Sequence, residues 1–442
     1  MNCNCAYCRN DLPFDLPAEI VEATKAGNLI LFAGAGISTE NDLVFKETLY
    51  EDVAGELDLK TEIDFPSLMS KYCSQVNGRA KLLEKVHQRF EYCQQFPELY
   101  RVATKFHKEV SSIYSIDKII TTNWDDYFEL ECNAIPIVTA EDFAFYNIES
   151  RKVFKIHGSI SNYGSVIATT EDYKKCYKNL NSGLIGGYLK TLLATKVVVF
   201  VGYSFKDFDF NKIYSFLRKE LGEIIPHCYI VTIDKTFKEK LKNEKSTVIE
   251  TSGSYFFSVL RAHLEGINFL LPKSNLDAVH YLYYLRSDIH KNSEDYFKKH
   301  RTTTAMYNLF YQDGIRHAFD YLIYHSKSGQ SFNEKKIMTL LRSYEQIKKG
   351  CIKEKNYPDY VYVEGFSIGL MSILSDIPIK HFPFYYIMGL GTIVSFKRFA
   401  SLLKQNPVYH KAADAMGKKY FKSSLDKNSD TVHHHRAFIG GG

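Results

Sequence analysis

The 442-residue sequence has neither the strong net charge that would indicate nucleic-acid binding nor the long apolar run of a membrane-spanning helix. Its net charge is only +5, from 56 basic and 51 acidic residues, which is too weak by itself to indicate nucleic-acid binding. Its longest apolar stretch, residues 382–396, is shorter than the roughly 20 residues of a membrane-spanning helix and contains two glycines and a proline. We therefore expect that stretch to form buried core, and we expect no membrane association.

The P-loop motif and a disulfide framework are also absent. No GxxxxGK[ST] loop occurs, which argues against a P-loop ATPase. The nine cysteines are odd in number and scattered, and the polar N-terminus does not resemble a signal peptide, so reduced thiols in a cytoplasm are expected. Cys3, Cys5 and Cys8 include one CxxC pair. A structural zinc site needs four ligands, so we expect free thiols there, with zinc completed by a distant ligand as the alternative.

What is present is an ordinary folded composition with many aromatic residues. Hydrophobic residues make up 45% and charged residues 24% of the chain, which suits a packed core. The chain has 32 tyrosines and 31 phenylalanines. Because tyrosine-rich surfaces are common at protein interfaces, we expect a homo-oligomer.

Short apolar runs alternate with helical patterns in the first part of the chain. A helix is predicted over residues 16–28, and residues 46–112 look mostly helical. Strands are predicted over residues 29–34, 117–122, 152–158, 196–202 and 227–233, with 246–251 as a weaker candidate. Strands alternating with helices predict an α/β fold with a doubly wound, Rossmann-like parallel sheet.

Pro272 marks a change of pattern, because helical periodicity dominates after it. The sequence therefore predicts a cysteine-rich arm over residues 1–12, an α/β domain over 13–272, a helical domain over 276–425 and a flexible tail over 426–442. The tail contains His433, His434 and His435, for which metal binding stays an alternative to disorder.

The first motif is the turn GAGIS, residues 34–38, directly after a predicted strand. Glycines there let a backbone approach a phosphate closely, so Gly34, Ala35, Gly36 and Ser38 are candidate cofactor contacts. Thr39 stands where the dinucleotide fingerprint GxGxxG requires glycine or alanine. A purely structural turn is therefore the alternative for this motif alone.

Further polar residues follow other predicted strands. Asn123 and Asp125 come after the second strand, where a helix cap is the alternative. His157 ends the third strand as a candidate general base, although a lone histidine is more often structural. Gly202 and Ser204 follow the next strand. Asp234 comes last, where a carboxylate can accept hydrogen bonds from ribose hydroxyls.

The order of these motifs over residues 13–272 resembles that of sirtuins, and in particular the sirtuin-like domains of bacterial antiphage-defence proteins. The resemblance implies an NAD+ hydrolase that releases nicotinamide and ADP-ribose. It implies that Asn123 holds the nicotinamide ribose and the attacking water. It also implies that His157 is the general base and that Asp125 contacts the carboxamide of nicotinamide. The pyrophosphate contacts it implies are Gly34, Ala35, Gly36 and Ser38, and the adenosine contacts are Gly202, Ser204 and Asp234.

The sequence departs from protein-deacylating sirtuins at two places. The G-I-P-D-F-R run that they carry after the first turn is missing, and residues 159–201 contain only Cys176, so their two-CxxC zinc ribbon cannot form. We expect no zinc in the catalytic domain and no other metal ligands. An NAD-dependent deacylase or ADP-ribosyltransferase, and a non-catalytic NAD- or nucleotide-binding assembly subunit, stay as alternatives.

The resemblance also bears on control and partners. An ungated NAD+ hydrolase would poison its own cell, so region 276–425 is expected to regulate or assemble the enzyme. A HerA-type hexameric ATPase, encoded as a second chain, is one partner that the resemblance implies. DNA contact is expected only through such a complex.

Overall fold

The computed structural model describes residues 10–38, 44–203, 215, 219, 227–237, 245–374, 379–405 and 407–437. The chain divides into two compact units. The first comprises residues 1–269 together with 327–329, and the second comprises residues 270–326 and 330–442. The first unit is α/β and the second is mainly helical, as the sequence predicts.

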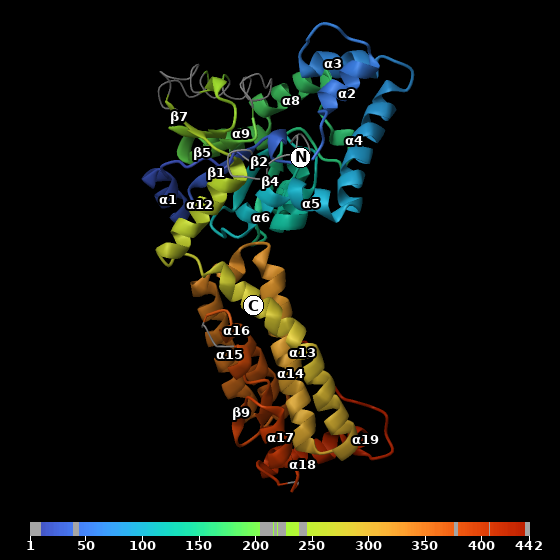
Figure 1. Ribbon diagram of the computed structural model, residues 1–442, viewed down its shortest axis with the longest axis vertical. Helices are drawn as coiled ribbons and strands as arrows, with labels where there is room; N and C mark the ends of the chain where they lie inside the picture. The colour runs from blue at the N-terminus through green and yellow to red at the C-terminus, as the bar shows by residue number, and fades with distance from the viewer. Residues whose placement is uncertain are drawn as a thin grey trace. The chain divides into compact units, whose positions relative to one another are not determined.

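A seven-stranded parallel sheet forms the centre of the first unit, in the order β3-β4-β2-β1-β5-β6-β7. Figure 1 labels β4, β2, β1, β5 and β7 of this sheet. Its strands are β1 (Leu29–Ala33), β2 (Lys118–Thr121), β3 (Ile135–Ile137), β4 (Lys152–Lys155), β5 (Val197–Val201), β6 (Cys228–Thr232) and β7 (Ser246–Glu250). All six predicted strands are confirmed, including the weaker candidate. The sequence missed β3, because it is three residues long and contains Pro136. A proline is tolerated there because β3 is an edge strand.

The chain reverses direction across the sheet at β1. From β1 it continues to β2 on one side, and after β4 it crosses to β5 on the other side. The switch point of the sheet therefore lies between β1 and β5, and the carboxyl edge of the sheet around these strands is here called the crevice. Ligands of open α/β sheets bind at such a switch point.

Helices cover both faces of the sheet because its central strands are apolar on both sides. Alternate β1 side chains, Ile30 and Phe32, pack with Leu189 and Leu192 of α9, while Phe106 of α6 and Phe257 of α12 meet edge-to-face on the other side. The helices of this unit are α1 (Ala18–Lys25), α2 (Leu49–Glu56), α3 (Phe65–Cys73), α4 (Gly78–Gln95), α5 (Pro97–Ala103), α6 (Lys105–Ser111), α7 (Tyr127–Cys132), α8 (Thr170–Ser182), α9 (Leu184–Thr195) and α12 (Gly253–Gly266).

The second unit is organised around α14, whose side chains are largely buried. Gly314 of α14 and Gly365 of α16 allow the two helices to cross in direct backbone contact: a Cβ on Gly365 would lie 1.9 Å from the Tyr311 carbonyl oxygen. Its helices are α13 (Lys273–His300), α14 (Thr303–Ser326), α15 (Glu334–Lys353), α16 (Tyr357–Met371), α17 (Phe396–Leu403), α18 (Lys411–Tyr420) and α19 (Lys422–Leu425).

A small hairpin and the C-terminal stretch complete this unit. The apolar run 382–396 forms strands β8 (Tyr385–Ile387) and β9 (Gly391–Ile393), and β8 is buried as expected of core. The Arg301 guanidinium donates hydrogen bonds to the carbonyl oxygens of Ser424 in α19 and of Ser429 and Thr431 after it. Within the described ranges, no helix is long and apolar enough to cross a bilayer.

Candidate active site

Strand register brings the predicted site residues to one edge of the sheet. The last paired row across four strands runs through Lys155, Thr121, Ala33 and Val201. Asn123 and His157 each stand two residues beyond this row, on the adjacent strands β2 and β4. Gly34 and Gly202 each stand one residue beyond it, on β1 and β5. The motifs that are dispersed in the sequence therefore converge at the crevice.

The glycines of the first and fourth motifs pack against each other. Gly36 N donates to Gly202 O at 3.0 Å, and Gly34 N donates to Val201 O at 2.8 Å. A Cβ on Gly34 would lie 2.7 Å from Gly202 O, and Gly202 has φ +79°. The glycines thus serve loop packing; within the turn Gly36 is exposed and Ala35 is half-buried. Ser204, predicted beside Gly202, lies outside the described residues.

Asn123 presents an unused acceptor in the site. Its Nδ2 donates to Gly34 O at 3.2 Å, which fixes the orientation of the amide because a carbonyl only accepts. Asn123 is 5% exposed, and its Oδ1 is buried with no hydrogen-bond partner among the described residues. Leaving such an atom unsatisfied costs about 1–3 kcal/mol, so the position suits a donor from a bound ligand or water.

Ser38 and Asp125 join the first motif to the second. Ser38 Oγ donates to Asp125 Oδ2 at 2.9 Å, and the other carboxylate oxygen accepts from Tyr127 N at 3.2 Å. Burial raises the pKa of the Asp125 carboxyl, while the charge of Lys155 and the Ser38 hydroxyl act in the opposite direction. Ser38 therefore lies where it orients Asp125, in addition to its predicted place in a phosphate turn.

Lys155 holds the loop that carries Asn123 and Asp125, a role that the sequence analysis missed. Its side chain is fully buried, and Nζ donates to the carbonyl oxygens of Trp124 and Asp125 and to Glu129 Oε1 at 3.0 Å. The signal was available, since a lysine interrupts an otherwise apolar strand in KVFKIHG. A buried lysine needs such partners to offset the loss of its hydration.

His157 is 2% exposed and tightly held at the end of β4. Its ring lies edge-to-face on Tyr173 with 4.9 Å between centroids, and its carbonyl oxygen accepts from Ile167 N at 2.9 Å. Gly158 follows with φ +83°, where a Cβ would lie 2.1 Å from Ser165 O. The chain thus turns sharply after the histidine and fixes its position at the sheet edge.

Asp234 lies on the far side of the crevice, beyond β6. Its Oδ1 accepts from Thr236 N at 2.9 Å and from Thr236 Oγ1 at 2.7 Å, and its own backbone N–H donates to Thr232 Oγ1 at 3.0 Å. This local turn accounts for one carboxylate oxygen.

Tyr203 is a second residue that the sequence analysis missed. Its hydroxyl lies 3.1 Å from both Ala33 O and Thr122 Oγ1, and its ring fills the space beside Gly34. It thereby links the ends of β1, β2 and β5. Its position within G-Y-S was visible, but its inward direction depends on the sheet order.

Helices α2–α4 form a separate apolar cluster beside the site. Leu68, Tyr72 and Leu82 lie in it, and Trp124 from the β2 loop packs against it. Ile160 N donates to Trp124 O at 2.8 Å, which ties the β4 loop to the β2 loop. These contacts hold the segments containing Asn123 and His157 in place from the side opposite to the sheet.

Comparison with known proteins matches this part of the chain to a described family. Residues 117–254 match the SIR2-like domain. The chain is 30% identical over 213 residues to NAD(+) hydrolase ThsA of Cytobacillus dafuensis, covering 46% of this chain and 41% of the relative. It is 30% identical over 215 residues to NAD(+) hydrolase ThsA of Enterococcus faecium, covering 46% and 42%.

A further relative carries a defence description. Defense-associated sirtuin 2 of Bacillus subtilis is 24% identical over 262 residues, covering 53% of this chain and 23% of the relative. The chain spans about two fifths of the length of the hydrolases that it matches. The parallel sheet and the polar residues at its carboxyl edge agree with the match of the region from β2 to the start of α12 to the SIR2-like domain.

Proposed function

We propose that this protein is an NAD+ hydrolase that cleaves NAD+ to nicotinamide and ADP-ribose, and that it acts in bacterial antiphage defence by depleting NAD when triggered. The observation that carries the proposal is the buried, unused Oδ1 of Asn123, one strand away from His157 at the carboxyl edge of the sheet. The names of the related hydrolases support the same activity.

The reaction fits the side chains present. Nicotinamide in NAD+ is a cationic leaving group, so its bond to the ribose C1′ breaks without a general acid, and the bonding electrons stay on the pyridine nitrogen. The sugar passes through an oxocarbenium-like state that water then attacks. Asn123 Oδ1 accepts a hydrogen bond from the ribose or the water, and His157 removes the proton that the water loses.

The remaining assignments concern substrate binding. Asp125, oriented by Ser38, contacts the carboxamide of nicotinamide. Because the N–H groups of Gly34 and Gly36 donate within the packed turns, the backbone N–H of Ala35 faces the pyrophosphate, and Asp234 faces the adenosine ribose. Because the reacting residues are nearly inaccessible to bulk water, their electrostatic interactions with the substrate are strengthened.

Product analysis tests the proposal. Purified protein is incubated with NAD+, and products are identified by mass. Asn123→Ala and His157→Ala should each lower turnover by about 10²–10⁴-fold, the usual contribution of a general base or an equivalent group, with unchanged circular dichroism. His263→Ala, an exposed histidine on α12, is the matched control and should retain activity.

Three outcomes would contradict the proposal. Near wild-type turnover in either site variant would remove the assigned roles. O-acyl-ADP-ribose formed from an acylated peptide would indicate a deacylase. NAD+ binding without turnover, both alone and with a partner ATPase, would indicate a non-catalytic subunit.

A further inference from the structure

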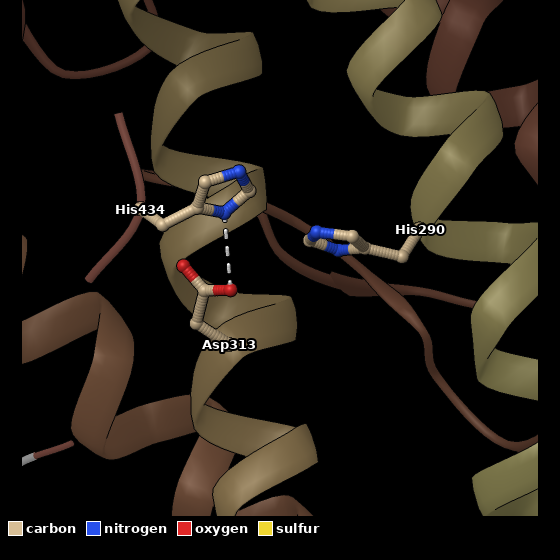
Figure 2. Close-up of side chains that lie close together, drawn as sticks. All are labelled: His290, Asp313 and His434. Carbon is tan, nitrogen blue, oxygen red and sulfur yellow. Dashed lines mark hydrogen bonds and ion pairs between the residues drawn. The ribbon is translucent and has the colours of Figure 1, made fainter. Parts of the chain in front are cut away.

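Three metal-ligating side chains from distant segments converge in the second unit. His290 lies on α13, Asp313 on α14 and His434 on the stretch after α19 (Figure 2). One candidate ligand atom from each residue lies within 4.8 Å of the other two, and no second cluster of this kind occurs among the described residues. His434 Nδ1 lies 3.3 Å from Asp313 Oδ1.

A buried network fixes the tautomer of His290. Gln312 Nε2 donates to Ser293 Oγ at 2.9 Å and to Phe384 O at 3.1 Å, which orients its amide. Gln312 Oε1 is therefore the acceptor that faces His290 Nδ1, at 3.0 Å. Since an amide oxygen only accepts, His290 Nδ1 carries the proton, and Nε2 of the neutral ring keeps its lone pair. This second hydrogen bond is typical of metal-binding histidines.

Asp313 supplies a buried anionic ligand. Its side chain is 6% exposed, and Oδ2 accepts from the backbone N–H of His435 at 2.8 Å. That bond leaves Oδ1 directed at His434. Burying a carboxylate is costly unless it is paired, so a cation at this position would offset its lost hydration.

Glu294 completes the surroundings with a second carboxylate. Its Oε1 lies 3.3 Å from His290 Nε2 and 3.6 Å from His434 Nε2. When His434 ligates through Nδ1, its Nε2–H can donate to Glu294, which raises the basicity of the ring. Such outer carboxylates commonly orient histidine ligands.

We propose that His290, Asp313 and His434 bind a divalent transition-metal ion of the zinc class. Two ligands of a tetrahedral zinc ion with bonds of about 2.0–2.1 Å lie about 3.4 Å apart. The His434–Asp313 separation already matches this value, and His290 reaches it by a small inward movement. Two imidazoles with one carboxylate suit zinc and leave a fourth position for water.

The ion would join three segments that are otherwise held by weaker contacts. It would fasten the C-terminal stretch to α13 and α14, next to the bonds that Arg301 makes to that stretch. Because the unfolded chain lacks this arrangement, binding would stabilise the folded unit in proportion to the logarithm of free metal concentration. The site lies outside the SIR2-like domain and is independent of the proposed NAD+ hydrolysis.

Cobalt serves as the probe because it reports its ligands spectroscopically. The full chain, freed of metal, is titrated with Co²⁺ and then with competing Zn²⁺. We expect one equivalent with visible bands of tetrahedral or five-coordinate cobalt, and no thiolate charge-transfer band from this site. Cys5→Ser/Cys8→Ser removes any thiolate contribution from the N-terminal pair and should leave those bands unchanged.

Graded variants assign the ligands. His290→Gln and His434→Gln should each weaken binding by more than 100-fold, and Glu294→Gln by about 10–100-fold, as for an outer partner. His381→Gln, an exposed histidine of the same unit, should bind as wild type. Zn²⁺ should raise the melting temperature of the wild-type chain and not that of His434→Gln.

Several results would overturn the site. One is the absence of cobalt bands at millimolar metal. Another is binding that survives His290→Gln but is lost in His434→Gln, which would assign the metal to the His433–His435 run alone. A third is a cobalt spectrum that consists only of thiolate bands and disappears with Cys5→Ser/Cys8→Ser.

Discussion

At the residue scale, the buried carboxyl group of Asp125 lowers the stability of the folded protein when it is charged. Burial raises its pKa above the unfolded value, so the folded protein binds more protons than the unfolded chain between the two pKa values. Stability from this group is therefore present at low pH and is lost as pH rises through the folded pKa. Burying this group in its charged form has a cost in stability, as is common for groups that act on a ligand.

Asp125→Asn tests this account. The amide keeps an acceptor for Tyr127 N and a donor for Ser38 Oγ, while it removes a buried charge. We expect the free energy of unfolding at pH 7 to rise by roughly 1 kcal/mol, and this gain to shrink toward pH 4. Turnover should fall about three- to ten-fold, the worth of one hydrogen bond to the carboxamide. Chemical denaturation at both pH values would measure the gain. A variant that is destabilised at neutral pH would contradict the account.

Lys155 is the second residue-scale test, because three acceptors depend on it. Lys155→Met would leave two carbonyl oxygens and the Glu129 carboxylate without their partner. Burial already raises the pKa of Glu129. We expect a loss of about 3–5 kcal/mol in unfolding free energy, together with loss of turnover. The added change Glu129→Gln should recover part of the stability in a double-mutant cycle. Lys174→Met, exposed on α8, is the control, and an equal loss there would refute a specific role for Lys155.

At the element scale, the turns after β1 and β5 form one packed unit. Gly202 is required there for two reasons, since its φ is positive and a Cβ would lie 2.6 Å from Ile37 Cγ2. The hydrogen bonds between the two turns connect the strands on either side of the switch point. The shape of the crevice therefore depends on contacts between the two loops themselves.

Gly202→Ala should separate these loops. We expect the free energy of unfolding to fall by about 1–3 kcal/mol because of backbone strain and steric overlap. Turnover should fall by a larger fraction than the free energy of unfolding does. Gly187→Ala is the matched control: that glycine lies in α9 with nothing within 4 Å of a Cβ, so the substitution should stabilise by about 0.5–1 kcal/mol. Thermal unfolding compares the pair. Equal effects of the two substitutions would show that the turn packing is unimportant.

At the scale of the whole molecule, the two compact units suggest a division between catalysis and assembly. The SIR2-like match and the polar residues of the crevice lie in the first unit. The second unit is helical and exposes Tyr281, Tyr284 and Tyr324, residues of a type enriched at interfaces. We propose that the second unit mediates homo-oligomerisation and contact with a HerA-type ATPase.

Light scattering after size exclusion tests this assembly. We expect the chain alone to have a mass that is a multiple of 51.0 kDa, and the mixture with the ATPase to elute as a larger complex. Tyr284→Asp should reduce the mass by placing a charge on an apolar contact, while an aspartate at the exposed Lys174 of the first unit should not. A monomer under every condition would exclude this arrangement.

The sequence by itself determined the sheet and the set of polar residues at its edge. Apolar runs long enough for buried strands are a local property, and residues that follow parallel strands must gather at one edge whatever the strand order. Asn123, Asp125 and His157 could therefore be selected without coordinates. The short strand β3 was not predicted, because three residues that include Pro136 show no periodic pattern.

Only the tertiary structure decided which side chains meet. Ser38 and Asp125 are 87 positions apart, and Asp313 and His434 are 121 apart. The role of Lys155 depends on hydrogen bonds to carbonyl groups on a neighbouring loop. Such pairings depend on strand order and helix packing, which bring together residues that no local pattern relates. The sequence could therefore indicate a candidate NAD site, whereas the orientation of the Asn123 amide, the contacts of the buried lysine and the separate histidine–aspartate cluster required the folded chain.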